Sequence, residues 1–226
     1  MKDLLYNPVF NALLSGDKNL SFGTGDVKYF DEQVSPFAGF HESYAKGFAD
    51  LFELLPKERK ILYATPVAIT QPGGWKLLHE IKGLQFIYEA EVEFKNDFAN
   101  VLPLEEMHID QMIQLAALTK PGPFGRGTIK FGSYYGIFED DKLVAMTGQR
   151  LHVQNFTEIS AVCTHPDHTG NGYAGTLMLH QLNLIRQQGQ RPFLHVREDN
   201  GRAIELYQRL GFKVSRKMNF YFLKRE

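Results

Sequence analysis

The chain contains a single cysteine and carries almost no net charge. Because Cys163 stands alone, an internal disulfide and a structural zinc site with several cysteines are excluded. The 25 lysines and arginines nearly balance 26 aspartates and glutamates, for a net charge of −1. This balance argues against a protein whose affinity depends on nucleic-acid phosphates, so we expect no nucleic-acid partner.

Long hydrophobic runs are also missing. No uncharged apolar stretch approaches the roughly 20 residues that a membrane-spanning helix needs, and the N-terminal segment lacks the basic and apolar regions of a secretory signal. We therefore expect a cytoplasmic protein with no membrane partner. With 43% apolar and 23% charged residues, the 226-residue chain can form a hydrophobic core.

The first 97 residues carry no chemical signature, and we expect residues 1–97 to form a smaller α/β domain. Two helices and then two strands are predicted there, at residues 8–14, 42–55, 61–64 and 84–88. Residues 21–31 contain two glycines and are predicted to be a loop. A degenerate copy of the second domain, without a ligand site of its own, is another interpretation of this segment.

The pattern is clearer in residues 98–226, which we expect to form a second domain. Its elements are predicted to be a helix, a hairpin, a strand, a helix, a strand, a helix and two final strands. They are placed near residues 109–116, 134–138 with 142–150, 156–163, 173–188, 192–196, 200–210 and 212–223. This order indicates an α/β fold whose sheet has strands of mixed direction.

A glycine-rich turn before a helix carries the main chemical signal. Gly170 and Gly172 precede a helix whose first N–H groups have no partner within the helix, and its dipole adds about half a positive charge. Glycine lets an anion approach these N–H groups. The turn is not a nucleotide P-loop, since no lysine and serine or threonine follow Gly172. A simple connection between elements is the alternative.

The spacing of Gly170, Gly172 and Gly175 is also that of a dinucleotide-binding turn. Such a turn needs an acidic residue at the end of the next strand to bind a ribose. Here Glu198 and Asp199 lie in the turn that follows the strand. A nucleotide-binding oxidoreductase is therefore an alternative that the missing acid disfavours.

Two motifs together resemble the GNAT superfamily of N-acetyltransferases. Residues 162–174, VCTHPDHTGNGYA, are similar to its acyl-CoA pyrophosphate loop, and residues 200–212, NGRAIELYQRLGF, are similar to its second signature. Within the superfamily the motifs look most like the branch of glycine N-acyltransferase, and the resemblance covers about residues 98–226. Thr169 stands where the family usually has arginine or glutamine, which implies weaker CoA binding.

The resemblance implies a splayed sheet flanked by helices, with acetyl-CoA or another acyl-CoA as co-substrate and no metal. Main-chain groups of Val162, Cys163 and Thr164 would pair with the pantetheine arm. The diphosphate would be bound by the turn at Thr169, Gly170, Asn171, Gly172, Tyr173, Ala174 and Gly175. Asn200 would contact the pantetheine arm, although a helix N-cap explains this residue equally well.

Tyr207 and Glu158 are the predicted catalytic residues. Tyr207 matches the family's general acid, which protonates the leaving thiolate; its place on an apolar helix face is otherwise typical of a core tyrosine. Alternation along the strand puts Glu158 on the same face as Val162 and Thr164. A carboxylate among apolar residues should have a raised pKa, which suits a general base. A solvated residue at a strand end is the alternative.

Other reactive side chains have simpler explanations. Cys163 would need a nearby base to act as a nucleophile, and a buried strand cysteine is the commoner case. His165 and His168 lack a third metal ligand. In the superfamily the segment before the hairpin, here residues 120–132, helps to form the acceptor pocket, although it could be only a flexible connection. The acceptor-binding candidates are Phe124, Arg126, Tyr134 and Tyr135.

We therefore expect an enzyme that transfers an acetyl group from acetyl-CoA to a primary amine by direct attack. The acceptor is a small-molecule or peptide amine whose identity the sequence leaves open. A homodimer is compatible with the sequence. The alternative from another class is a non-catalytic CoA-binding or CoA-sensing module with the same fold.

Overall fold

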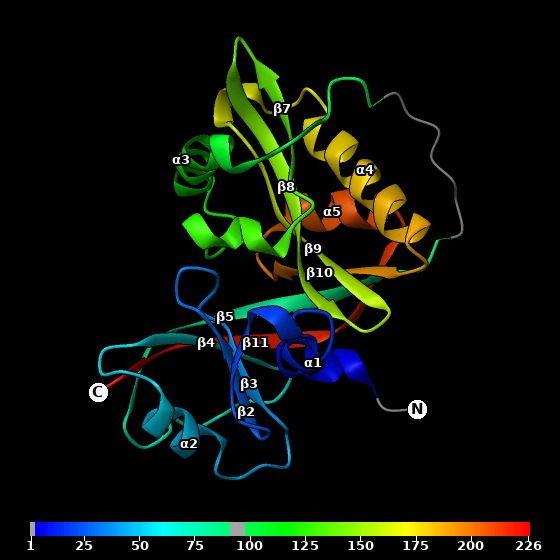
Figure 1. Cartoon of the computed structure of the whole chain (residues 1–226). Helices are drawn as coiled ribbons and strands as arrows, with labels where there is room; N and C mark the ends of the chain where they lie inside the picture. The colour runs from blue at the N-terminus through cyan, green and yellow to red at the C-terminus, as the bar shows by residue number, and fades with distance from the viewer. Residues whose placement is uncertain (1–2, 91–97) are drawn as a thin grey trace.

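The computed structural model describes residues 3–90 and 98–226, which form two sheets and five α-helices (Figure 1). The helices are α1 (Pro8–Leu14), α2 (Gly47–Leu54), α3 (Ile109–Thr119), α4 (Tyr173–Gln187) and α5 (Gly201–Arg209). The strands are β1 (Ser21–Gly23), β2 (Val27–Phe30), β3 (Ala38–Phe40), β4 (Lys60–Thr65), β5 (Trp75–Tyr88), β6 (Leu102–Pro103), β7 (Tyr135–Glu139), β8 (Lys142–Val153), β9 (Phe156–Thr164), β10 (Arg191–Arg197) and β11 (Phe212–Arg225). None of the helices in these described residues is long and apolar enough to cross a membrane.

The larger sheet has the strand order β4-β11-β5-β10-β9-β8-β7-β6, and β1, β2 and β3 form the smaller sheet. Neighbours in the larger sheet are antiparallel except β9 and β10, which run parallel. This mixed sheet with flanking helices confirms the predicted α/β fold class.

The expected domain boundary at residue 97 lies at the end of segment 91–97, outside the described residues. Strand β5 pairs with both β10 and β11, so main-chain hydrogen bonds join the two predicted domains. Part of the first segment therefore belongs to the sheet of the second. The division into residues 1–97 and 98–226, and the idea of a degenerate repeat, stay predictions.

Helices on the two faces of the larger sheet cover separate hydrophobic clusters. Helices α4 and α5 lie together on one face (Figure 1). Met178, Leu182 and other apolar side chains pack there against β5, β9 and β10. On the other face, α1 and α3 pack side chains such as Leu13 and Met112 against β8 and β9. Strand β9 contributes to both clusters, so its path is held from both sides.

Most predicted elements are found, and several are corrected. Residues 21–31 are not a loop but a hairpin of β1 and β2, with its turn at residues 24–26. The helix predicted from residue 42 begins only at Gly47, because residues 41–44 form a hydrogen-bonded turn.

Two further corrections lie in the second half of the chain. The predicted loop at residues 120–132 contains the 3-10 helix η4 (Arg126–Phe131). The two strands predicted within residues 212–223 are a single strand, β11. A bulge between Val214 and Arg216 bends this strand without ending it, because its pairing with β5 continues on both sides.

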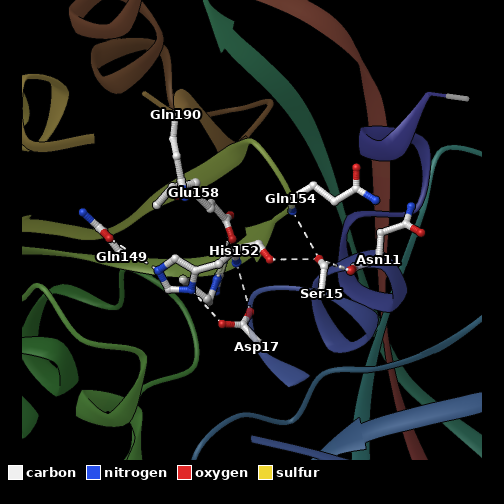
Figure 2. A network of polar contacts seen from close by, with 10 residues as sticks. Asn11, Ser15, Asp17, Gln149, His152, Gln154, Glu158 and Gln190 are labelled. Atoms are coloured by element: carbon white, nitrogen blue, oxygen red, sulfur yellow. Dashed lines mark hydrogen bonds and ion pairs between the residues drawn. The ribbon is translucent and has the colours of Figure 1, made fainter. Parts of the chain in front are cut away.

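A polar network ties the segment after α1 to β8 (Figure 2). The carboxylate of Asp17, which is 3% exposed, accepts hydrogen bonds from the backbone N–H of His152 at 3.0 Å and from its ring Nδ1 at 2.7 Å. The Ser15 hydroxyl donates to the carbonyl of Asn11 at 2.6 Å, lies 3.3 Å from that of His152, and accepts from the N–H of Gln154 at 3.2 Å. Because unpaired buried polar groups are costly, these bonds hold the N-terminal segment against the sheet.

Substitution of Gly148, in β8, should destabilise the fold. A Cβ at this position would lie 2.2 Å from the ring of Tyr134, which is 3% exposed and has little room to move. We expect Gly148→Ala to lower the free energy of unfolding by about 1–3 kcal/mol, measured by urea denaturation. Gly73→Ala is the control, since a Cβ there meets no atom within 4 Å; equal stability of both variants would contradict the prediction.

Candidate functional site

Strands β9 and β10 are hydrogen-bonded at one end only. Their register pairs residues 156–158 with residues 191–193. Beyond this point β9 continues along β8 to Thr164, and β10 continues along β5 to Arg197. The two strands therefore separate after Glu158, which confirms the predicted splay. The edge of β9 that faces β10 is left with main-chain groups that another molecule can pair with.

A β-bulge at Ala161 changes the direction of β9 inside this opening. Ala161 has a φ of +53°, and the register between β8 and β9 shifts here. Beyond a bulge the side chains change face. The predicted alternation is therefore wrong, because Val162 packs against the α4–α5 cluster whereas Glu158 pairs with Arg150 beside Phe37 on the opposite face.

The turn between β9 and α4 presents bare main-chain N–H groups. Gly170 and Gly172 have φ angles of +93° and +80°, which favour glycine. A Cβ at Gly170, Gly172 or Gly175 would meet no atom within 4 Å, so the space beside the turn is open. Within the described part of the chain, the N–H groups of residues 170–175 have no hydrogen-bond acceptor. Together with the positive end of the α4 dipole, these groups can bind an anion.

Thr169 closes the turn instead of reaching toward a ligand. Its N–H and its hydroxyl both donate to the carbonyl of Pro166, at 3.3 Å and 3.0 Å. The turn therefore has no long polar side chain at this position. Two cations from α5, Arg202 and Arg209, line the space in front of the turn, and the sequence motifs did not predict them.

Two hollows meet where β9 and β10 separate. The turn cleft has a volume of about 540 Å³ and is lined by the turn, by residues 162–164 and by one side of α5. The inner cavity has a volume of about 210 Å³ and lies between β9, β10 and the loop after α3. Thr119, Val162 and Asn200 line both hollows, so a ligand in one can contact a ligand in the other.

Asn200 begins α5 at the junction of the two hollows. Its side-chain oxygen accepts a hydrogen bond from the N–H of Ala203 at 3.2 Å, which confirms the N-cap interpretation. This bond uses the oxygen only, so the side-chain NH₂ group can still donate to a ligand. The predicted contact with a pantetheine arm stays a prediction.

Tyr207, in α5, lines the inner cavity while its ring packs in the core. The residue is 8% exposed, and its ring lies edge-on to those of Phe86 and Phe212. Burial, and then the nearby Cys163 sulfur, raise the pKa of Tyr207 to about 12. The phenol is therefore protonated at neutral pH and can donate its proton to a group in the cavity.

Glu158 is the last residue of β9 that pairs with β10, and it is fully buried. Arg150 donates to its two carboxylate oxygens at 2.9 Å and 2.7 Å, and His195 Nδ1 lies 2.8 Å from one of them. Burial raises the pKa of Glu158, but the charges and hydrogen bonds of Arg150 and His195 outweigh it and lower the pKa to about 2. The predicted raised pKa is therefore wrong, and this geometry gives no support to a general-base role.

His195 and Gln85 extend this cluster and were missed in the sequence. The Gln85 amide nitrogen donates to the carbonyl of Leu5 at 2.9 Å and lies 3.1 Å from His195 Nε2. Nδ1 of His195 donates to the Glu158 carboxylate, which fixes the orientation of the ring. No local motif marks these residues, since they lie on separate strands that only the sheet brings together.

The reactive groups near the turn have buried or acidic surroundings. Burial raises the pKa of the Cys163 thiol to about 11, which does not favour a nucleophilic thiolate. His168 Nδ1 lies 3.3 Å from a carboxylate oxygen of Glu139, and His165 Nδ1 lies 3.8 Å from one of Asp167. Among residues 3–90 and 98–226, no group of three or more His, Cys, Asp or Glu side chains could hold a metal ion.

The four acceptor-binding candidates lie in different places. Phe124 and Tyr134 pack edge-on and border a small space of about 10 Å³ beside Arg150. Arg126 forms an exposed ion pair with Asp110 at 2.6 Å. It lines neither hollow. Tyr135 contacts the ring of His180 at 4.2 Å and also lines neither hollow. The structure thus brings Phe124 and Tyr134 near the inner cavity and not the other two.

Comparison with known proteins agrees with this geometry. Residues 134–221 match the model of the FR47-like protein family. A solved acetyltransferase of the GNAT family from Novosphingobium aromaticivorans is 31% identical, with all of both chains covered and a TM-score of 0.92. The chain belongs to the GNAT family. This similarity extends over the whole chain and not only over residues 98–226.

More distant structures share the GNAT fold alone. A GCN5-related N-acetyltransferase from Kribbella flavida is 14% identical, covering 97% of this chain and 95% of that one, with a TM-score of 0.60. An acetyltransferase of the GNAT family from Colwellia psychrerythraea is 13% identical, covering 91% and 84%, with a TM-score of 0.52. No curated protein matches the chain. Membership of the GNAT family supports acyl transfer as the general chemistry of the site.

The Glu158 cluster should make the stability of this GNAT protein depend on acid pH. The pKa of Glu158 in the fold, about 2, is below its ordinary value of 4.5, so folding favours the ionised form. The resulting stabilisation is complete above pH 4.5 and is lost as the pH falls toward 2. We expect the difference in unfolding free energy between the unchanged protein and the double variant Arg150→Gln/Glu158→Gln to shrink over this range, measured by urea denaturation.

The double variant is the proper comparison because it leaves no buried charge without a partner. Arg150→Gln alone should cost about 3–5 kcal/mol near neutral pH, since the Glu158 carboxylate then loses its cation. A difference between the unchanged protein and the double variant that stays constant from pH 7 to pH 2.5 would show that Glu158 does not titrate as described.

Proposed function

We propose that the protein is an N-acetyltransferase that moves the acetyl group of acetyl-CoA to a primary amine. The observation that carries this proposal is the junction of the two hollows at the opening between β9 and β10. The turn cleft has the N–H groups for a diphosphate, and the inner cavity has space for a small acceptor. The finer resemblance of the motifs to the glycine N-acyltransferase branch stays a prediction.

In this proposal CoA occupies the turn cleft. Its diphosphate accepts hydrogen bonds from the N–H groups of residues 170–175, and Arg202 and Arg209 add the positive charge that Thr169 does not supply. The pantetheine arm lies along residues 162–164, pairing with the free edge of β9 as an added strand would. Asn200 then lies where the arm passes into the inner cavity.

The amine attacks from the inner cavity with both substrates bound. Its nitrogen forms the new bond to the thioester carbonyl carbon, the carbon–sulfur bond breaks, and the sulfur leaves as a thiolate. We assign to Tyr207 the proton that neutralises this thiolate, since its phenol is protonated and lines the cavity. A main-chain N–H near Val162 polarises the carbonyl oxygen.

We propose that solvent, and not Glu158, takes the proton of the attacking amine. The carboxylate of Glu158 is occupied by Arg150 and His195, and its pKa of about 2 makes it a weak base. Glu158 acts instead by holding Arg150 in place. We also propose a cytoplasmic location, where a reducing environment suits the single buried thiol of Cys163.

Tyr207→Phe tests the proposed acid. We expect kcat to fall about 100-fold while the affinity for acetyl-CoA changes less than about twofold, because the ring stays in the core and only the proton donor is lost. The measurements are thiol release over a panel of amines and calorimetry with acetyl-CoA. Unchanged turnover would remove this role from Tyr207.

Tyr88→Phe is the matched control for this variant. Tyr88 is buried in the same cluster, its ring also lies edge-on to Phe212, and its hydroxyl has no hydrogen-bond partner among residues 3–90 and 98–226. It lines neither hollow. A similar loss of turnover in both variants would point to the packing of the cluster and not to proton transfer.

Gly175→Ala tests the place of the diphosphate. A Cβ here meets no protein atom, so the fold should keep its stability or gain up to about 1 kcal/mol in helix propensity. The methyl group would enter the turn cleft, and we expect acetyl-CoA to bind about tenfold more weakly by calorimetry. The control is Gly201→Ala, where the added Cβ also has open space but lies outside the cleft. This variant should bind acetyl-CoA with unchanged affinity. Equal affinities of the two variants for acetyl-CoA would show that the diphosphate does not bind beside Gly175.

A non-catalytic CoA-binding module is the second candidate. The short side chain of Thr169 is the observation that favours it, whereas a buried, protonated Tyr207 at the inner cavity favours an enzyme. Binding of acetyl-CoA by calorimetry without thiol release for any amine would support the module.

A further inference from the structure

We infer that the acceptor is an amine that also carries a carboxylate, and that Arg150 is the residue that binds this carboxylate. The inference deepens the proposed function and rests on it. It concerns the inner cavity, on the side away from the turn cleft. Arg150 lines this cavity from β8, and neither the motifs nor the sequence pattern marks it as a ligand-binding residue.

The charges around the inner cavity are all of one sign. Lys120, Arg150 and Arg197 line it, and no aspartate or glutamate is among the lining residues in the described ranges 3–90 and 98–226. Arg150 is balanced by Glu158 behind it, and Arg197 is balanced by Asp199, with bonds of 3.0 Å and 2.6 Å. Lys120, which is exposed to solvent, has no ion-pair partner in the part of the chain described by the structure, so the excess positive charge lies on the solvent-exposed side of the cavity.

A simple amine does not suit such a cavity. Alkylamines and polyamines are cations at neutral pH, and like charges repel one another, although solvent weakens the repulsion from the exposed Lys120 and Arg197. An amine that also has a carboxylate brings a compensating negative charge into the cavity. The lining therefore selects against polyamines and for acceptors such as amino acids.

Arg150 has the geometry to bind that carboxylate. Its Nε and Nη2 donate to Glu158, which leaves the edge formed by Nη1 and the second N–H of Nη2. This edge offers two parallel N–H groups, the arrangement that binds a carboxylate through both oxygens. Nη1 donates no hydrogen bond within residues 3–90 and 98–226, although the Arg150 side chain is only 13% exposed.

The surroundings of Arg150 hold it in position. Its guanidinium lies 4.9 Å from the centre of the Phe37 ring, and Glu158 is held by His195, which in turn contacts Gln85. A guanidinium fixed in this way loses little conformational entropy when it binds a second carboxylate. Glu158 and His195 are therefore positioning residues for Arg150.

The experiment measures acetyl transfer by the full chain to pairs of amines that differ only in the carboxylate. Each amino acid in the panel is compared with its primary amide, and spermidine serves as a polycation. We expect kcat/KM to be about 10- to 100-fold higher for the acid than for its amide, with no turnover of spermidine. Amides or spermidine that react as well as the acids would overturn the inference.

The double variant Arg150→Gln/Glu158→Gln assigns the effect to Arg150 without leaving a buried charge. It should raise KM for the acids about tenfold or more, with smaller changes in kcat, in KM for the amides and in the affinity for acetyl-CoA. A control, Lys213→Gln/Glu89→Gln, removes an exposed pair at 3.0 Å outside the cavity and should change none of these. An equal rise in KM for acids and amides would contradict the role of Arg150.

A second readout separates this inference from the proposed function. If no amine in the panel is acetylated, binding of the same acids and amides to the CoA-saturated protein is measured by saturation-transfer NMR. Binding of acids but not amides, lost in the Arg150→Gln/Glu158→Gln variant, would uphold the inference and leave acetyl transfer unsupported. Binding of neither class would overturn the inference.

Discussion

The site depends on the early end of hydrogen bonding between β9 and β10. Parallel neighbours in a sheet normally pair along their shared length, but these two strands pair only at residues 156–158 and 191–193. The bulge at Ala161 turns β9 away, and the buried side chains of Glu158, Arg150 and His195 fill the point of separation. Without this opening, the glycine-rich turn would lead to a closed sheet with no space for a ligand.

Helices on both faces make the opening a fixed feature of the fold. Residues of β9 pack toward α4 and α5 on one side and toward α1 and α3 on the other, so β9 is not free to rejoin β10. The network of Asp17 and His152 holds the N-terminal segment against β8, behind the same strand (Figure 2). The two hollows are thus supported by the core, and the turn supplies only the anion-binding groups at one end.

Electrostatics divides the site into two parts with different tasks. In the turn cleft, main-chain N–H groups and the dipole of α4 can bind an anion without any buried side-chain charge. In the inner cavity, the charges are on side chains, and each buried charge has a partner, as Arg150 has Glu158. Tyr207 lines the inner cavity with its proton retained, because burial disfavours the phenolate.

The sequence alone determined the α/β class, most helices and strands, and the glycine-rich turn, because these depend on local periodicity and on backbone preferences of glycine. The paired motifs also pointed to Asn200 and to residues within 162–175, which line the turn cleft together, and to Tyr207, which lines the inner cavity. Only the tertiary structure showed that Glu158 forms an ion pair with Arg150 and that its pKa is lowered. The bulge at Ala161 changes which side chains share a face, and the charge of Glu158 depends on Arg150 and His195, which come from neighbouring strands. Burial and partners of this kind arise when the sheet assembles, and no local pattern along the chain encodes them.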